Sequence, residues 1–190
     1  VASRGTPILP GERDPRACKN HFYAWAVPFV WVIPQDVVKR GAHISVAENA
    51  RPISPSSVDP TIKNYHWGDM TAALFLALEL GYDTTVLLDE QDQISESPGF
   101  NVFAVIGGRV VTSKSGMLEG ISRKTVMEIC EALNIPCEAN DVSKDDFLKA
   151  EEVFTATTAG GIVPVTRVDA RILGNDVMGP LTAKILQTYW

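Results

Sequence analysis

Cysteine is scarce in this chain, and the few cysteines present suggest no cross-link or metal site. Cys18, Cys130 and Cys137 provide neither a paired disulfide framework nor the CxxC spacing of a zinc site. Cys18 lies close to His21, but no second pair of ligands accompanies them, so no metal site is expected. A reducing, cytoplasmic setting is the simplest interpretation.

Basic charge and long apolar runs are scarce as well. The 17 Lys and Arg against 23 Asp and Glu give a formal net charge of −6, and the absence of a basic stripe argues against a nucleic-acid partner. The longest apolar run, Phe22 to Ile33, is too short to span a membrane, and its aromatic and β-branched residues predict a buried strand. GxSxG elbows and P-loops are also missing. With 190 residues, 45% of them hydrophobic, we expect a soluble globular protein.

The pattern of apolar runs and turn residues predicts more strands than helices. Two glycines, Gly107-Gly108, separate two β-type runs and indicate a hairpin. The predicted strands are His43–Ala47, Thr84–Leu88, Phe100–Ile106, Arg109–Thr112, Val153–Thr155 and a second hairpin over Ile162–Leu173. Because the strands come as hairpins rather than as repeated βαβ units, the predicted fold class is α+β with mixed, mostly antiparallel sheets.

Four helices are predicted between these strands. Residues 70–80 are expected to form a buried helix with Asp69 as N-cap and Gly81 as its stop. A second helix is expected to begin at Ser122 as N-cap, with an apolar face made by Val126, Ile129, Cys130 and Leu133. A short acidic helix near Lys144–Lys149 and a final helix from Pro180 complete the set.

The stretch from Val58 to Asp69 places one lysine, Lys63, in a short connection before the first long helix. Asp59-Pro60 disfavours helix and keeps the chain extended there. Apolar and aromatic neighbours are expected to desolvate the Lys63 amine, which makes a lysine available as a nucleophile. Most lysines in short loops are solvated surface groups, so position alone leaves both interpretations open.

Two further stretches have the features of anion sites, and a carboxylate accompanies them. Gly120-Ile121-Ser122 offers free backbone N–H groups at the start of a helix, and Thr157 to Gly161 offers hydroxyls and amides in a glycine-containing loop. Glu96 lies in a polar turn. Each feature alone is common in capped helices and turns. Together, an amine, a carboxylate and two phosphate sites suit pyridoxal phosphate, whose aldehyde, ring nitrogen and phosphate need these partners.

Four motifs follow one another in a fixed order. They are Asp59-Pro60-Thr61-Ile62-Lys63-Asn64 with Trp67-Gly68-Asp69, Glu96 with Gly99-Phe100-Asn101, Leu118-Glu119-Gly120-Ile121-Ser122-Arg123-Lys124, and Thr157-Thr158-Ala159-Gly160-Gly161-Ile162 with Pro164. With these motifs the chain resembles, over nearly its whole length, the class IV aminotransferases, pyridoxal-phosphate enzymes of fold type IV. Within this family, which includes branched-chain and D-amino-acid aminotransferases, it is most similar to the (R)-selective amine transaminases.

The resemblance implies a role for each matching residue. Lys63 resembles the lysine that holds the cofactor as a Schiff base and moves the proton at the substrate carbon. Glu96 resembles the carboxylate that keeps the pyridine nitrogen protonated. The other implied cofactor contacts are Leu118 on the ring, the backbone amides of Ile121 and Ser122 on the phosphate, and the Thr158 hydroxyl on the phosphate. The implied substrate pocket consists of Val30, Tyr65, Trp67, Thr157 and Ala159, for which plain packing is an equal alternative.

The resemblance also implies two domains. Residues 1–33 match the tail of a small N-terminal domain, 34–38 a linker, and 39–190 the large cofactor domain. The chain opens at Val1 without a methionine and ends at Trp190 inside a predicted helix, so we expect it to be part of a longer protein. The family's phosphate-clamping arginine would then lie upstream. Pro10 occupies the place of an arginine that binds the keto-acid carboxylate in amine transaminases, and Arg13 is the nearest basic side chain.

The expected reaction is ping-pong transamination from a primary amine, (R)-configured, to a keto acid such as pyruvate. A homodimer with the active site at its interface is implied, with no membrane or nucleic-acid partner. Two alternatives stay open: an amino-acid aminotransferase of the branched-chain or D type, and a non-catalytic binding domain that kept the fold. His66 beside Trp67 is interpreted as part of the pocket wall rather than as a general base, because Lys63 fills that role.

Overall fold

The computed structural model describes residues 1–190, which form two compact units, Val1–Val30 and Trp31–Trp190. The first unit contains a short antiparallel pair, β1 (Ala2–Ser3) and β2 (His21–Phe22), with a 3₁₀ turn, η1 (Pro15–Ala17), between them. All other helices and strands belong to the second unit. None of the helices combines the length and the hydropathy that crossing a membrane requires.

The apolar run from Phe22 to Ile33 is not the buried strand that its composition predicts. Only Phe22 belongs to a strand, and residues 23–33 contain no regular structure. Trp25 and Phe29 are 70% and 58% exposed. An apolar sequence becomes a buried strand only where another layer covers it and a neighbouring strand pairs with it, and most of this run has neither.

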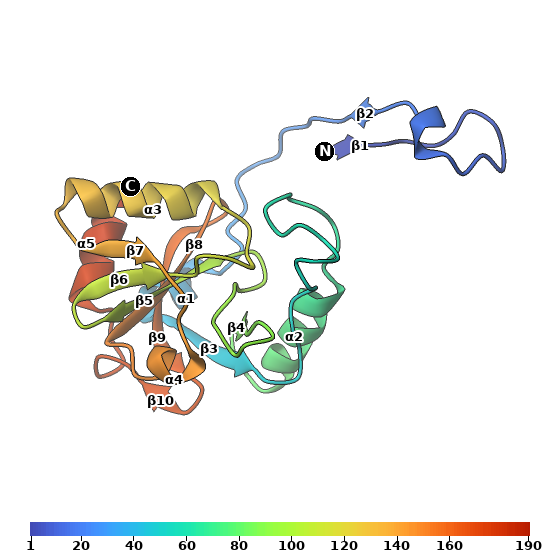
Figure 1. Ribbon diagram of the computed structural model, residues 1–190. Helices are drawn as coiled ribbons and strands as arrows, with labels where there is room; N and C mark the ends of the chain where they lie inside the picture. The colour runs from blue at the N-terminus through green and yellow to red at the C-terminus, as the bar shows by residue number, and fades with distance from the viewer. The chain divides into compact units, whose positions relative to one another are not determined.

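A mixed eight-stranded sheet forms the second unit (Figure 1). Its strands run in the order β4-β3-β9-β8-β5-β6-β7, and β10 pairs with β9. Their bounds are β3 (Ala42–Ala47), β4 (Thr84–Leu87), β5 (Asn101–Ile106), β6 (Arg109–Thr112), β7 (Cys137–Ala139), β8 (Glu152–Thr157), β9 (Gly161–Val168) and β10 (Arg171–Ile172). Four of the seven pairings are antiparallel, in agreement with the predicted fold class.

Two of the parallel pairs are βαβ units, which the hairpin pattern of the sequence does not predict. Helix α2 (Gly68–Glu79) connects β3 to β4, and α3 (Ile121–Ala132) connects β6 to β7. Parallel neighbours cannot be joined by a tight turn and need a crossover of this kind. The remaining helices are α1 (Gln35–Arg40), α4 (Lys144–Phe147) and α5 (Pro180–Tyr189).

The two faces of the sheet bury separate hydrophobic cores. Along β5, Val102 and Ala104 belong to one core, whereas Phe103 and Val105 belong to the other. This alternation follows from the two-residue period of a strand. Helices α3 and α5 pack together over the second core, next to β8 and β9, and Figure 1 shows them on the same side of the sheet.

Local predictions succeeded where glycine or a helix face determines the structure. Gly107 and Gly108 have φ of 58° and 72° and join β5 to β6 as a hairpin, as predicted. The apolar face of α3 is buried at Val126, Ile129 and Cys130, and Leu133 packs partly against the same core. Residues 34–38, expected to be a linker, run into α1, where Val37 is buried.

The predicted N-caps and the predicted burial of α2 were wrong, whereas Gly81, with φ of 85° directly after the C-cap Leu80, ends α2 as predicted. Trp67 occupies the N-cap position of α2, and Asp69 lies in its first turn, where its carboxylate accepts the Ile53 N–H at 2.7 Å. Gly120, not Ser122, is the N-cap residue of α3. Only two side chains of α2 are buried, Ala73 and Ala77, because just one narrow stripe of this helix meets β3 and β4. Three of its large apolar side chains are exposed: Phe75, Leu76 and Leu78.

Candidate active site

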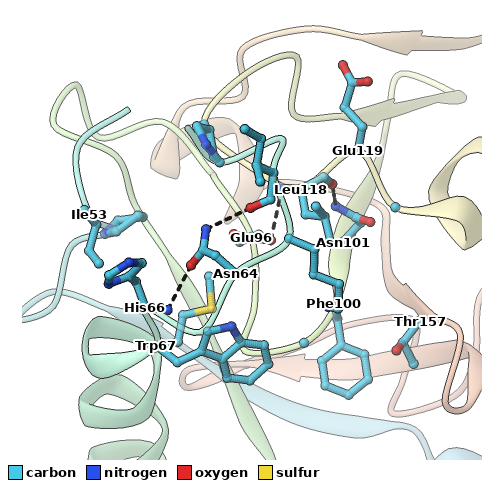
Figure 2. Close-up of a pocket in the computed structure, with 18 of the residues that line it drawn as sticks. Ile53, Asn64, His66, Trp67, Glu96, Phe100, Asn101, Leu118, Glu119 and Thr157 are labelled. Atoms are coloured by element: carbon cyan, nitrogen blue, oxygen red, sulfur yellow. Dashed lines mark hydrogen bonds between the residues drawn. The ribbon is translucent and has the colours of Figure 1, made fainter. Parts of the chain in front are cut away.

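A pocket of about 370 Å³ lies within the second unit. It is bordered by the segment before α2, the turn before β5, the loop before α3 and the end of β8. Of the residues singled out in the sequence, it brings together Lys63, Trp67, Glu96, Leu118, Ile121, Ser122, Thr157 and Thr158. Figure 2 shows Glu96 between Asn64 and Asn101, with the Trp67 and Phe100 rings along one side.

Lys63 lines this pocket but is exposed, so the expected desolvation of its amine is absent. Its neighbours Ile62 and Tyr65 are 63% and 80% exposed and do not cover it. The Lys63 Nζ lies 6.0 Å from the centre of the Trp67 ring, at the outer limit of a cation–π contact. The amine is therefore accessible to a ligand that enters the pocket.

Glu96 is the unusual charged group of the pocket. Its carboxylate is partly buried and accepts one hydrogen bond, from the Leu118 N–H at 3.4 Å. Burial raises the pKa of Glu96 to about 7, and the negative charge of Asp69 acts in the same direction. The Leu118 N–H and the positive charge of Lys63 lower this pKa without offsetting the burial. A carboxylate in this state is suited to a cationic or proton-bearing partner.

Asn101 fixes the loop that carries Leu118. Asn101 is the first residue of β5, and its side-chain N–H donates to the Leu118 carbonyl at 2.8 Å. Its Oδ1 lies so close to Gly120 that a Cβ there would be 2.2 Å away, so only glycine fits. Asn101 is 6% exposed. A buried polar residue at the start of an apolar strand was a signal for this role, although no role for Asn101 was predicted.

The start of α3 provides the candidate anion site. No side chain caps this helix, and the Lys124 N–H donates to the Gly120 carbonyl at 3.0 Å, as the first turn requires. The N–H groups of Ile121 and Ser122 therefore have no partner within the helix. Thr158, which follows β8 and also lines the pocket, is exposed, and the buried Thr157 hydroxyl accepts the Ala159 N–H at 3.4 Å.

Three of the predicted substrate-pocket residues do not line this pocket. Tyr65 is 80% exposed, although its neighbours Asn64 and His66 do line the pocket. The Ala159 carbonyl accepts the Val32 N–H at 2.8 Å. Val30 belongs to the first unit and is 65% exposed.

In this arrangement an accessible amine, a carboxylate with a raised pKa and the free N–H groups of a helix start share one pocket. The amine can attack a carbonyl group and exchange a proton. The carboxylate can hold a protonated nitrogen, and the helix start can hold a phosphate. A pocket of this size accommodates a ligand of cofactor size.

Comparison with known proteins places this site in a family context. Residues 9–168 match the family described as amino-transferase class IV. The branched-chain-amino-acid aminotransferase of Escherichia coli K12 is 34% identical over 185 residues, which are 95% of this chain and 59% of that protein.

Solved structures of branched-chain aminotransferases share the fold. The enzyme from Thermoproteus uzoniensis, determined with norvaline, superposes with a TM-score of 0.78 at 30% identity, covering 86% of this chain and 53% of that one. Another branched-chain amino acid aminotransferase, in complex with N-(5'-phosphopyridoxyl)-L-glutamate, gives a TM-score of 0.76 at 28% identity, covering 80% and 52%. The chain spans between 27% and 64% of the length of the first curated relatives that it matches.

Proposed function

The chain belongs to the class IV aminotransferase family, and from this premise we propose that it carries the active site of a pyridoxal-phosphate-dependent transaminase. Glu96 is the observation that carries the proposal. Its carboxylate is partly buried, has a pKa of about 7 and accepts one backbone hydrogen bond, so a positively charged partner would stabilise its charged form. The protonated ring nitrogen of pyridoxal phosphate would be such a partner, and one of the similar solved structures is a complex with a phosphopyridoxyl compound.

The other pocket residues fit the remaining parts of the cofactor. Lys63 would hold its aldehyde, Leu118 would pack on its ring, and the backbone amides of Ile121 and Ser122 would bind its phosphate together with the Thr158 hydroxyl. When bound, pyridoxal phosphate supplies a carbonyl group that takes up an amino group and a ring that withdraws electrons from the reacting carbon.

The side chains of this chain then perform the binding and proton transfer. The Lys63 Nζ, once free, accepts a proton from the carbon of the donor and returns it when the acceptor is aminated. Glu96 keeps one proton between its carboxylate and the ring nitrogen, which maintains electron withdrawal. Trp67 and Phe100 line the same pocket, and the centre of the Trp67 ring lies 6.0 Å from the Lys63 Nζ.

Branched-chain amino acids are the donor class that the relatives favour, with a keto acid as acceptor. The relatives and the solved structures compared above are named as branched-chain aminotransferases. A second candidate is transfer from an (R)-configured primary amine to pyruvate. The Trp67-Gly68-Asp69 and Thr157-Thr158 motifs favour it, and both Trp67 and the two threonines line the pocket.

The proposal includes an assembly and a domain division. Residues 1–33 would be the end of a small domain, 34–38 a connection, and 39–190 the large cofactor domain. The protein would act as a homodimer. The exposed apolar side chains of α2 and its C-cap, with Phe75 63% and Leu80 74% exposed, supply surface for such a contact.

Borohydride reduction with peptide mapping tests the cofactor assignment. The protein is mixed with pyridoxal phosphate and reduced, and we expect the label on Lys63. Lys63→Ala should carry no label there and should lose at least about 100-fold in transamination rate, the lower range for a proton-transfer group. Lys39→Ala, on α1 outside the pocket, is the matched control and should keep both. A label on another residue, or a colourless protein that shows no absorbance change with the cofactor, would reject the proposal.

A donor panel separates the two substrate classes. Leucine, isoleucine and valine are compared with (R)-1-phenylethylamine, each with 2-oxoglutarate and with pyruvate. Turnover of the amino acids alone removes the amine transaminase, and turnover of the amine alone removes the branched-chain assignment.

A further inference from the structure

The last two residues of the chain contact the start of α3 and the start of β9. The Tyr189 hydroxyl lies 2.9 Å from the Ser122 hydroxyl, in the first turn of α3. The Trp190 ring lies against Gly161, at the turn between β8 and β9, where a Cβ would come within 2.7 Å of the ring. Gly161 has a φ of 66°, so glycine is required there for two reasons.

Packing holds Tyr189 in this place. Helices α3 and α5 share the second hydrophobic core, in which Ile185 is fully buried and Tyr189 is partly buried. The Tyr189 and Trp190 rings meet edge to face, with centres 5.4 Å apart. The Trp190 ring also lies 5.9 Å from that of Trp31. The end of α5 is therefore anchored on several sides before it reaches Ser122.

The hydroxyl and the backbone N–H of Ser122 have different surroundings. Its hydroxyl is buried, since the residue is 3% exposed, and it is committed to Tyr189. Its backbone N–H, together with that of Ile121, belongs to the unpaired start of α3 that lines the pocket. The side chain thus holds the backbone in place, and the backbone is the part that can face an anion.

We propose that Tyr189 is a positioning residue for phosphate binding: it holds the first turn of α3 through the Ser122 hydroxyl. This inference rests on the proposed function, because the phosphate in question is that of pyridoxal phosphate. Loss of the Tyr189 hydroxyl should weaken binding of the phosphate group by the first turn of α3. The contacts of Lys63, Glu96 and Leu118 to the aldehyde and the ring should stay unchanged.

The test compares two ligands that differ only in the phosphate. Dissociation constants for pyridoxal phosphate and for pyridoxal are measured by absorbance titration of the full-length protein and of Tyr189→Phe. We expect Tyr189→Phe to weaken pyridoxal phosphate about 3- to 10-fold, the range for one lost hydrogen bond, and to leave pyridoxal unchanged. Ser122→Ala should have the same effect, and the double variant should be no weaker than either single one.

Tyr82→Phe is the matched control, because it removes a tyrosine hydroxyl away from this pocket, and both constants should stay unchanged. Equal weakening of both ligands, an unchanged constant for pyridoxal phosphate, or additive effects in the double variant would overturn the role of Tyr189. If the unmodified protein binds neither ligand, the proposed function fails first and the inference fails with it.

Discussion

At the scale of single residues, the environment of Glu96 lowers the stability of the folded protein and at the same time favours binding of the cofactor. Folding places its carboxylate where water is scarce and provides one backbone donor, from Leu118. This arrangement raises the free energy of the charged form in the empty protein. The same arrangement favours a protonated ring nitrogen as partner, so a local loss of stability becomes a gain in cofactor binding.

A pH titration of cofactor-free protein can measure this cost. The pKa of Glu96 rises from its ordinary value of 4.5 to about 7, so between these pH values the folded state holds a proton that the unfolded chain has lost. Stability therefore falls as pH rises through this window. Relative to the unmodified protein, Glu96→Gln should gain about 1–3 kcal/mol between pH 4.5 and pH 8 in denaturant unfolding.

Glu90→Gln, an exposed turn residue, is the control for this series and should track the unmodified protein at every pH. If the free energy of unfolding depended on pH in the same way for Glu96→Gln and for the unmodified protein, the raised pKa of Glu96 would be contradicted.

The presence of Lys63 and Glu96 in one site could be predicted from the sequence, whereas the contacts of Asn101 and Tyr189 could not. Lys63 and Glu96 stand in motifs whose residue types match a known chemistry, and the structure places both in one pocket. Asn101 and Tyr189 act through contacts with Leu118 and Ser122, 17 and 67 positions away. Contacts of this length depend on the packed fold, and local patterns do not report them.

At the scale of helices and strands, local patterns determined the type of element better than its burial. A helix over residues 70–80 was predicted, and α2 spans Gly68–Glu79. The exposure of its side chains was not predicted, because only one narrow stripe of α2 meets β3 and β4. The Gly107-Gly108 hairpin was predicted because positive φ at both positions is a local requirement. The strand predicted from Phe22 to Ile33 does not form, because a buried strand needs a neighbouring strand and a covering layer.

Helix α5 depends on a carboxylate from another element, which gives a prediction at this scale. The buried Glu152 of β8 accepts the N–H groups of Leu181 and Thr182 at 3.0 and 2.8 Å, and the Thr182 hydroxyl at 2.7 Å. Glu152→Gln loses the charge and puts an amide N–H against these donors. Because a buried cap made by a charged group is lost, we expect about 1–3 kcal/mol less stability in denaturant unfolding.

The adjacent Glu151 provides the control, since it is exposed and accepts one N–H, from Gly108 at 3.2 Å. Glu151→Gln should change stability by less than about 0.5 kcal/mol. Equal losses in the free energy of unfolding for Glu152→Gln and Glu151→Gln would show that the hydrogen bonds of Glu152 to the start of α5 do not add to stability.

At the scale of the whole molecule, stability and the candidate site both belong to the unit Trp31–Trp190. Both hydrophobic cores begin at or after Ile33, and all lining residues of the pocket fall between Pro52 and Thr158. The first unit holds a two-stranded pair and many exposed aromatic residues. Cooperative unfolding of the chain should therefore report on the second unit.

Limited proteolysis of the 190-residue chain tests this division. Chymotrypsin should cut first after Tyr23, Trp25 or Phe29, which are 53%, 70% and 58% exposed in a segment without regular structure. Because neither core loses a residue, the remaining fragment should keep the unfolding midpoint of the intact chain within about 3 °C. In Trp25→Ser/Phe29→Ser, cleavage should slow and shift to Tyr23. Early cleavage after the buried Phe103 or Phe154, or a fragment that unfolds at much lower temperature, would show that the first unit is needed to hold the second together.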